Sequence, residues 1–87
     1  MVTVFIPAQL KELTGGITSV EVEASNIRQV VERLEQLFPG IQQRLCDGDA
    51  IRLGLQVSID SVMTSRGLIA KVQSGNEIHF VPAFGGG

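Results

Sequence analysis

The sequence predicts an α+β fold, in which a mixed sheet of four or five strands carries one main helix on one face. Three observations lead to this prediction. Two segments with period-two alternation open the chain, one segment with helical spacing follows, and further strand-like segments close it. A chain of 87 residues has room for one small domain with a single hydrophobic core. This order of elements is typical of a sheet covered by a helix.

The two opening segments predict an antiparallel hairpin. The first strand covers residues 2–6 and ends at Pro7, with Phe5 on the face opposite the core. After a short connector around residues 11–16, residues 18–24 alternate valine with glutamate, so one face of this strand is apolar and the other is charged. The expected inward residues are Val2, Val4, Ile6, Val20 and Val22.

One amphipathic helix is predicted over residues 27–38. Asn26 and Gln29 have the spacing of a capping box, which satisfies the free N–H groups at a helix start. Pro39 and Gly40 end the helix, since proline cannot continue the hydrogen-bond ladder and glycine tolerates a left-handed turn. A short helical piece is expected at residues 41–45. The apolar residues at helical spacing are Ile27, Val30, Val31, Leu34, Leu37 and Phe38.

The second half of the chain contains two more predicted strands. Residues 53–59 alternate leucine, valine and isoleucine with smaller or polar residues, and residues 77–82 place Ile78 and Phe80 inward. The region 60–74 is expected to be rich in loops, with turns at 47–49 and 74–76. If the first and last strands lie side by side in the middle of the sheet, the arrangement is a β-grasp, the ubiquitin-like fold. We expect this domain to cover residues 1–83 and a flexible glycine tail to cover residues 84–87.

Composition and charge argue against several functional classes. Seven lysines and arginines are spread among nine acidic residues, and the chain has no tryptophan or tyrosine, so nucleic-acid binding is not expected. No segment has the features of a signal peptide or the length of a membrane span. The single cysteine, Cys46, excludes an internal disulfide and fits a reducing cytoplasm.

The predicted domain contains no self-contained active site and no metal site. His79 has no partner at ligand spacing, so we interpret it as a solvent-side histidine of a strand. Cys46 has no basic neighbour in sequence and is interpreted as an inert thiol. The pair Gly15-Gly16 lacks the lysine of a phosphate loop, and Asp47-Gly48-Asp49 is too short for a calcium loop.

The most informative feature is the terminal run Gly85-Gly86-Gly87. Three glycines form a thin tether that ends in a carboxylate, and residues 83–87 span about 16 to 18 Å when extended. Such a tail fits a narrow tunnel in another protein. The alternative is a frayed end without function.

Three segments carry a resemblance to a known family. These are the connector Leu10-Lys11-Glu12-Leu13-Thr14-Gly15-Gly16, the helix end Pro39-Gly40-Ile41, and the closing residues 75–87 with their Pro-Ala step and terminal glycines. Together they resemble the ThiS/MoaD-type ubiquitin-like sulfur carriers. Within that family, the opening strand and Thr14-Gly15-Gly16 most resemble the carrier of thiocarboxylate-dependent cysteine biosynthesis. The small subunit of molybdopterin synthase is the next most similar type.

The resemblance implies a sulfur donor that serves as a co-substrate of partner enzymes and is not itself an enzyme. A ubiquitin-activating-like enzyme would use ATP to adenylate the terminal glycine, which would then become a thiocarboxylate for a sulfur-accepting biosynthetic enzyme. The carrier itself would bind no cofactor. The family commonly ends on two glycines, so the reactive residue is either Gly87 or, after trimming by a protease, Gly86.

Partner recognition is expected on the sheet face opposite the helix. Phe5 and Val81 would lie close together there, and Phe84 would anchor the start of the tail. Loop residues 62–68 covering this patch are the alternative. Two further classes remain open: a modifier joined to lysines of other proteins, and a non-covalent interaction module. The sulfur acceptor is also open among activated serine, a pterin precursor, a thiazole precursor and tRNA.

Overall fold

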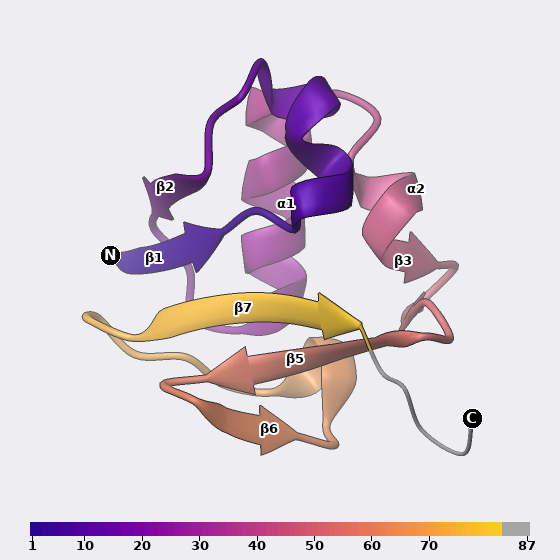
Figure 1. The fold of residues 1–87 in the computed structure, drawn as a ribbon. Coiled ribbons are helices and arrows are strands. Elements are labelled where there is room, and N and C mark those ends of the chain that lie inside the picture. The colour runs from indigo at the N-terminus through magenta and orange to yellow at the C-terminus, as the bar shows by residue number, and fades with distance from the viewer. Residues whose placement is uncertain (83–87) are drawn as a thin grey trace.

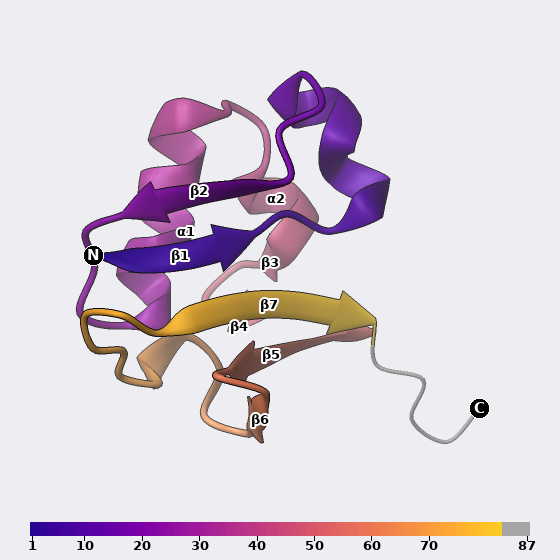
Figure 2. The same cartoon turned by 60° about the vertical axis from the view of Figure 1, so that its left-hand side comes forward.

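The computed structural model of this chain describes residues 1–82, which form one five-stranded sheet with a helical layer on one face (Figures 1 and 2). The order of strands in the sheet is β2-β1-β7-β5-β6. Their bounds are β1 Val2–Phe5, β2 Ser19–Val22, β5 Leu55–Ile59, β6 Val62–Thr64 and β7 Glu77–Pro82. The remaining elements are η1 Ala8–Thr14, α1 Ile27–Leu37, α2 Gln42–Leu45, the two-stranded hairpin of β3 Cys46–Asp47 and β4 Ala50–Ile51, and η2 Gly67–Ile69.

The first and last strands meet in the middle of the sheet, as the sequence predicted. β1 pairs antiparallel with β2 and parallel with β7, and β7 pairs antiparallel with β5 on its other side. The mixed sheet with α1 on one face confirms the β-grasp prediction. β7, which leads to the terminal glycines, is therefore the central strand.

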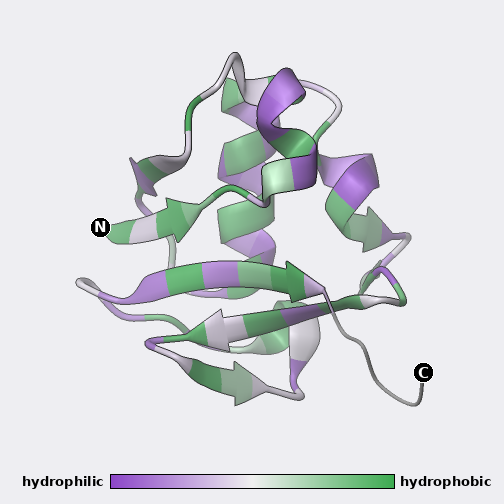
Figure 3. Ribbon diagram, viewed as in Figure 1, coloured by the Kyte–Doolittle hydropathy of each residue, from purple (hydrophilic) through white to green (hydrophobic). Residues whose placement is uncertain are grey.

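The core forms between the sheet and α1, where the expected inward residues lie. Val2 and Val4 are fully buried, and they pair with Val22 and Val20 of the neighbouring strand. In Figure 3, the ribbons of β1, β7 and α1 carry the corresponding bands of hydrophobic residues. Val20 is only partly buried, because it lies on the edge strand β2.

The start of α1 carries a modified form of the predicted cap. Asn26 Oδ1 accepts a hydrogen bond from Gln29 N at 2.8 Å, which satisfies one free N–H of the first turn. Gln29 Oε1 accepts from Ser25 N at 2.7 Å, one residue before the position that a capping box uses. The helix ends at Leu37, within one residue of the predicted end, and Leu37 itself is 53% exposed rather than part of the core.

Some elements differ from the sequence-based prediction. The connector after β1 contains the 3₁₀-helix η1, and the region predicted as loop-rich contains the edge strand β6. β6 follows a tight turn in which Asp60 and Ser61 both have positive φ, a conformation that the sequence signals poorly because neither residue is glycine. The third predicted strand begins at Leu55 instead of Leu53.

None of the helices within residues 1–82 has the length and apolar character needed to cross a membrane.

Candidate functional site

The predicted reactive residues lie beyond the part of the chain that the structure describes. Gly85, Gly86, Gly87 and the predicted anchor Phe84 are outside residues 1–82, and so is the predicted boundary between domain and tail. The structure describes their attachment point, which is the end of β7.

β7 holds this attachment point firmly, because it is paired along both edges. Ile78 pairs with Val4 on one side and with Ile59 on the other. Ile78 and Phe80 are buried in the core beneath α1, with exposed fractions of 0% and 3%. Pro82, the last described residue, still pairs with Leu55 of β5. The five residues that follow therefore start from a fixed point and reach about 16 to 18 Å when extended.

An aromatic stack lies on the opposite face of the sheet, at the centre of the predicted partner surface. The rings of Phe5 and His79 are parallel within 3°, with centroids 4.3 Å apart. The two residues face each other across the β1–β7 ladder, and both are half-buried. His79 therefore lies on the solvent side of the sheet, as predicted, and is packed there against an aromatic ring.

Val81 lies on the same face, two residues beyond His79 along β7. It is half-buried and pairs with Gln56 of β5. The immediate neighbour of Phe5 is therefore His79, while Val81 extends the surface toward the attachment point of the tail. We refer to Phe5, His79 and Val81 as the outer sheet face.

The alternative, in which residues 62–68 cover this face, does not agree with the structure. Residues 62–64 form β6, which continues the sheet beyond β5 and is separated from β1 by two strands. η2 packs against α1 and β4 instead, and Leu68 is buried in the core. The segment therefore extends the sheet and closes the core on the helix side.

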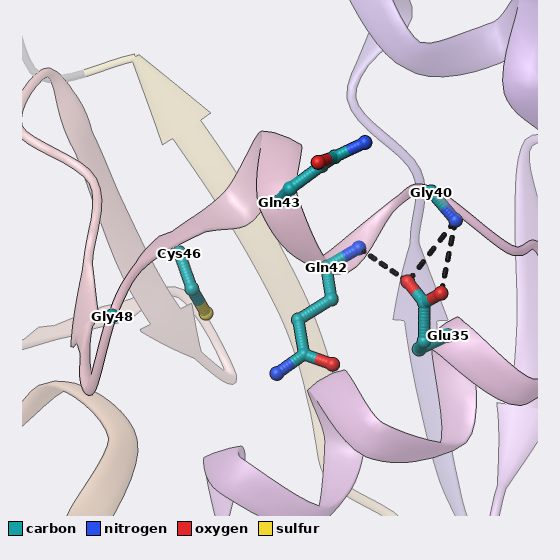
Figure 4. A pocket seen from close by; sticks show the side chains of 6 residues that line it. All are labelled: Glu35, Gly40, Gln42, Gln43, Cys46 and Gly48. Atoms are coloured by element: carbon teal, nitrogen blue, oxygen red, sulfur yellow. Dashed lines mark hydrogen bonds between the residues drawn. The ribbon is translucent and has the colours of Figure 1, made fainter.

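A pocket of about 510 Å³ lies near α2, and it contains the chain's only cysteine (Figure 4). The carboxylate of Glu35 accepts hydrogen bonds from Gly40 N at 3.0 Å and from Gln42 N at 2.9 Å. These bonds from the backbone of Gly40 and Gln42 lower the pKa of Glu35. The carboxylate therefore stabilises the turn that leads into α2 and is poorly suited to accept a proton at neutral pH.

Burial raises the pKa of the Cys46 thiol in this pocket, although the charge of Arg28 acts in the opposite direction. A thiol with a raised pKa is largely protonated at neutral pH, and the thiolate is the reactive form. This agrees with the interpretation of Cys46 as an inert thiol. Within residues 1–82, no three histidine, cysteine, aspartate or glutamate side chains are grouped so that they could hold a metal ion.

The two glycine motifs that could suggest ligand loops form turns. Gly15 and Gly16 have φ of 66° and 92°, and Gly16 N donates to Lys11 O at 2.9 Å at the end of η1. Gly48, with φ of 63°, lies in the hairpin between β3 and β4. Both predictions of turn geometry are confirmed.

The Phe5–His79 contact is the feature of the surface that the sequence did not reveal. Each residue could be placed on the outer face from the alternation of its own strand. Their contact depends on the register between β1 and β7, which are far apart in the chain and joined by no turn. The only local sequence feature that pointed to this contact was the presence of a histidine within the last strand.

Comparison with known proteins places these features in a family. The ThiS family matches residues 4–87. The sulfur carrier protein CysO of Mycobacterium tuberculosis is 34% identical over 91 aligned positions, which cover 99% of this chain and 98% of the relative. The crystal structure of the Amycolatopsis orientalis BexX/CysO complex contains a similar chain, with a TM-score of 0.90, 31% identity and full coverage of both chains. Crystalline CysO of M. tuberculosis has a TM-score of 0.86 and 28% identity, with 95% of this chain and 99% of that chain covered.

The sequence match and the fold agree over nearly the whole chain, including the strand that leads to the glycines. The chain therefore belongs to the ThiS family and is a sulfur carrier protein.

Proposed function

We propose that the chain carries sulfur as a thiocarboxylate on Gly87 and delivers it to an enzyme that makes cysteine. The observation that carries the proposal is the full-length similarity to CysO together with a central strand that leads directly into the glycine tail. The chain acts as a co-substrate and leaves catalysis to its partners.

Activation of the terminus needs a partner and ATP. A free α-carboxylate is ionised at neutral pH and is a poor electrophile. In the proposed sequence, a carboxylate oxygen attacks the α-phosphorus of ATP and expels pyrophosphate, which gives an acyl-adenylate. Sulfide supplied by a separate donor then attacks the carbonyl carbon and expels AMP, leaving the thiocarboxylate. The thiocarboxylate sulfur would then displace the activating group from the β-carbon of an activated serine. Water would cleave the acyl bond to the carrier, which releases cysteine and restores the terminal carboxylate.

The glycines suit this chemistry for a steric reason. A side chain next to the reacting carbonyl would hinder the approach of ATP and of the sulfur nucleophile, while glycine adds no such bulk. The reach of about 16 to 18 Å lets the carboxylate enter an active site while the folded domain stays outside.

The outer sheet face is the proposed docking surface for the partner. The Phe5–His79 stack and Val81 form a half-buried apolar surface on the strand that bears the tail and on its neighbour. Aromatic side chains at the centre of a contact often dominate its binding energy. The neighbouring structure from A. orientalis is a complex of CysO with BexX, which supports a carrier that works by docking on another protein.

The decisive experiment is intact-mass spectrometry of the full chain isolated from its native cells. We expect a fraction of molecules with one oxygen replaced by sulfur, and fragmentation should assign that change to the last glycine. A terminus that is always an ordinary carboxylate, in cells that are actively making cysteine, would contradict the proposal. The same spectra show whether the chain ends on Gly87 or is trimmed to Gly86.

A tail-deletion variant separates this role from that of a non-covalent module. Removal of Gly86 and Gly87 should abolish complementation of cysteine synthesis while the domain remains folded, because the core of the described domain is built from residues between Val2 and Phe80. Full complementation by the shortened chain would favour the non-covalent module.

A further inference from the structure

A second pocket lies beside the attachment point of the tail, on the helix side of the sheet. It has a volume of about 190 Å³ and is formed by the start of η1, by α2 and by the chain that enters β5. We call it the tail-root pocket. The lining residues that matter here are Pro7, Leu10, Arg44, Arg52, Leu53 and Leu55.

The position of the tail-root pocket follows from the strand register. Leu55 lines the pocket and pairs directly with Pro82, the last described residue before the tail. Leu55 belongs to the same alternating set as buried Val57, so it points to the helix side of the sheet. The end of β7 is therefore flanked by the outer sheet face on one side and by this pocket on the other.

The charge of the pocket is unusual for this chain, whose net charge is −2. Arg44 and Arg52 both line it, and no acidic side chain does. Neither arginine takes part in an ion pair within residues 1–82, where the ion pair present joins Arg28 to Asp49. Arg52 Nη1 donates to Gln43 O at 3.0 Å, which fixes the guanidinium beside α2. Among the described residues, no acidic side chain balances these two positive charges of the pocket.

Leu53 adds an apolar contact at the rim of the pocket. Its side chain is fully exposed, with a relative exposure of 101%, although leucine is usually at least partly buried. It lies in a turn closed by the hydrogen bond from Leu55 N to Arg52 O, and Gly54 has φ of 90° there. This turn presents an arginine and a leucine together next to the tail.

We propose that the tail-root pocket receives an acidic side chain and an adjacent apolar side chain of the enzyme that activates the tail. The proposal rests on the proposed function. An enzyme that acts on Gly87 must approach the end of β7, because the tail reaches only about 16 to 18 Å from it. A carboxylate between Arg44 and Arg52 gains charge-assisted hydrogen bonds, and arginine presents its donors in a fixed fork that fits a carboxylate.

In this proposal, the pocket and the outer sheet face make different contributions to the binding of the activating enzyme. The outer face supplies aromatic and apolar contact on one side of β7, and the pocket supplies charge complementarity on the other. Charge complementarity mainly sets the specificity and the rate of association of a complex. The two arginines would therefore decide which activating enzyme accepts this carrier.

The test compares full-length variants that replace the natural copy in native cells. The pocket variant is Arg44→Glu with Arg52→Glu. The matched control is Arg33→Glu with Arg66→Glu, which makes the same change of net charge at two exposed arginines outside the pocket. We expect the thiocarboxylate fraction to fall about tenfold or more in the pocket variant and to stay unchanged in the control.

A third variant, Leu53→Ser, separates docking from folding. Because Leu53 is fully exposed, this change should leave the thermal unfolding midpoint unchanged and still lower the thiocarboxylate fraction by about threefold or more. A pocket variant that is folded and loaded as fully as the natural chain overturns the proposal but leaves the proposed function intact. A natural chain without any thiocarboxylate overturns the proposed function itself.

The other possible occupant of the pocket is the carrier's own terminal carboxylate. We expect the amide NMR signals of Gly86 and Gly87 in the isolated chain to be the same in the natural protein and in the pocket variant. A large shift of both signals on loss of the arginines would mean that the tail fills the pocket, and this result overturns docking by a partner.

Discussion

The ring of Phe5 lies flat against the imidazole ring of His79, with centroids 4.3 Å apart and planes within 3° of parallel. The contact joins the first strand to the last, in the parallel pair at the middle of the sheet. It lies directly before the segment of β7 from which the tail leaves. The contact therefore lies on the strand that leads to the proposed reactive terminus.

The first prediction concerns the energy of this stack. In a double-mutant cycle of Phe5→Ala and His79→Ala, we expect a coupling of about 0.5 to 1.5 kcal/mol in the free energy of unfolding, since aromatic pairs contribute this much beyond area burial. Urea unfolding of the four proteins measures it. Phe5→Ala with Met63→Ala is the control pair, because Met63 lies on the edge strand β6, two strands beyond β7. Coupling of the same size in the control pair would contradict a specific contribution from the stack.

The second prediction concerns Glu35, whose carboxylate accepts hydrogen bonds from the backbone of Gly40 and Gln42. Because these bonds lower its pKa in the folded state, its contribution to stability is fully present above the pKa of an unfolded glutamate. The contribution is lost as pH falls through the lowered pKa of the folded state. Glu35→Gln should therefore lower the unfolding midpoint at pH 7, and the difference from the natural protein should shrink in acid.

Glu32→Gln is the matched control for this experiment, since Glu32 is an exposed residue of the same helix. Thermal unfolding followed by circular dichroism from pH 7 down to pH 3 gives the comparison. A Glu35→Gln effect that is equally large at both ends of this range would mean that the carboxylate charge is not what stabilises the turn into α2.

Much of the fold could be predicted from the sequence, because local residue patterns determine its strands and its main helix. Alternation in residues 2–6 and 77–82 placed the core residues correctly, and Asn26 with Gln29 marked the start of α1. β6 was missed for an equally local reason. Its turn uses Asp60 and Ser61 at positive φ, where the usual sequence signal would be asparagine or glycine.

Only part of the candidate site could be predicted from the sequence. The terminal glycines stand out in the sequence, and Phe5 and Val81 could be assigned to the outer face from alternation alone. The neighbour of Phe5 could not be predicted from alternation, since it depends on the parallel register of two distant strands. The tail-root pocket could not be predicted either, because its parts are distant in sequence. Arg44 comes from α2, Arg52 comes from the chain before β5, and the tail follows β7.

The third prediction concerns the reactivity of Cys46. Because burial raises the pKa of its thiol, iodoacetamide should modify the folded protein far more slowly at pH 7 than it modifies the chain in urea. The raised pKa also makes stability fall as pH rises above the pKa of an unfolded cysteine, since the unfolded chain then releases its proton more readily. This alkaline loss should be smaller in Cys46→Ala. Rapid modification of the folded protein would show that the pocket near α2 leaves the thiolate accessible.

The last prediction separates the tail from the domain. Gly86→Ala places a methyl group on the residue before the reacting carboxyl group of Gly87 and changes none of the described core residues, the last of which lies in β7. We expect an unchanged unfolding midpoint and a loss of about 10- to 100-fold in the rate of adenylation, because a small displacement of a reacting group has a large effect on rate. Release of pyrophosphate by the activating enzyme measures that rate.

Gly85→Ala is the matched control, since it adds the same methyl group one residue further from the carboxylate. Its effect on adenylation should be clearly smaller, because its methyl group lies further from the reacting carbon of Gly87. Equal losses in both variants would mean that the length of tail free of side chains, rather than access to the carbonyl, limits activation. No loss in either variant would remove the steric reason for glycine at this end of the chain.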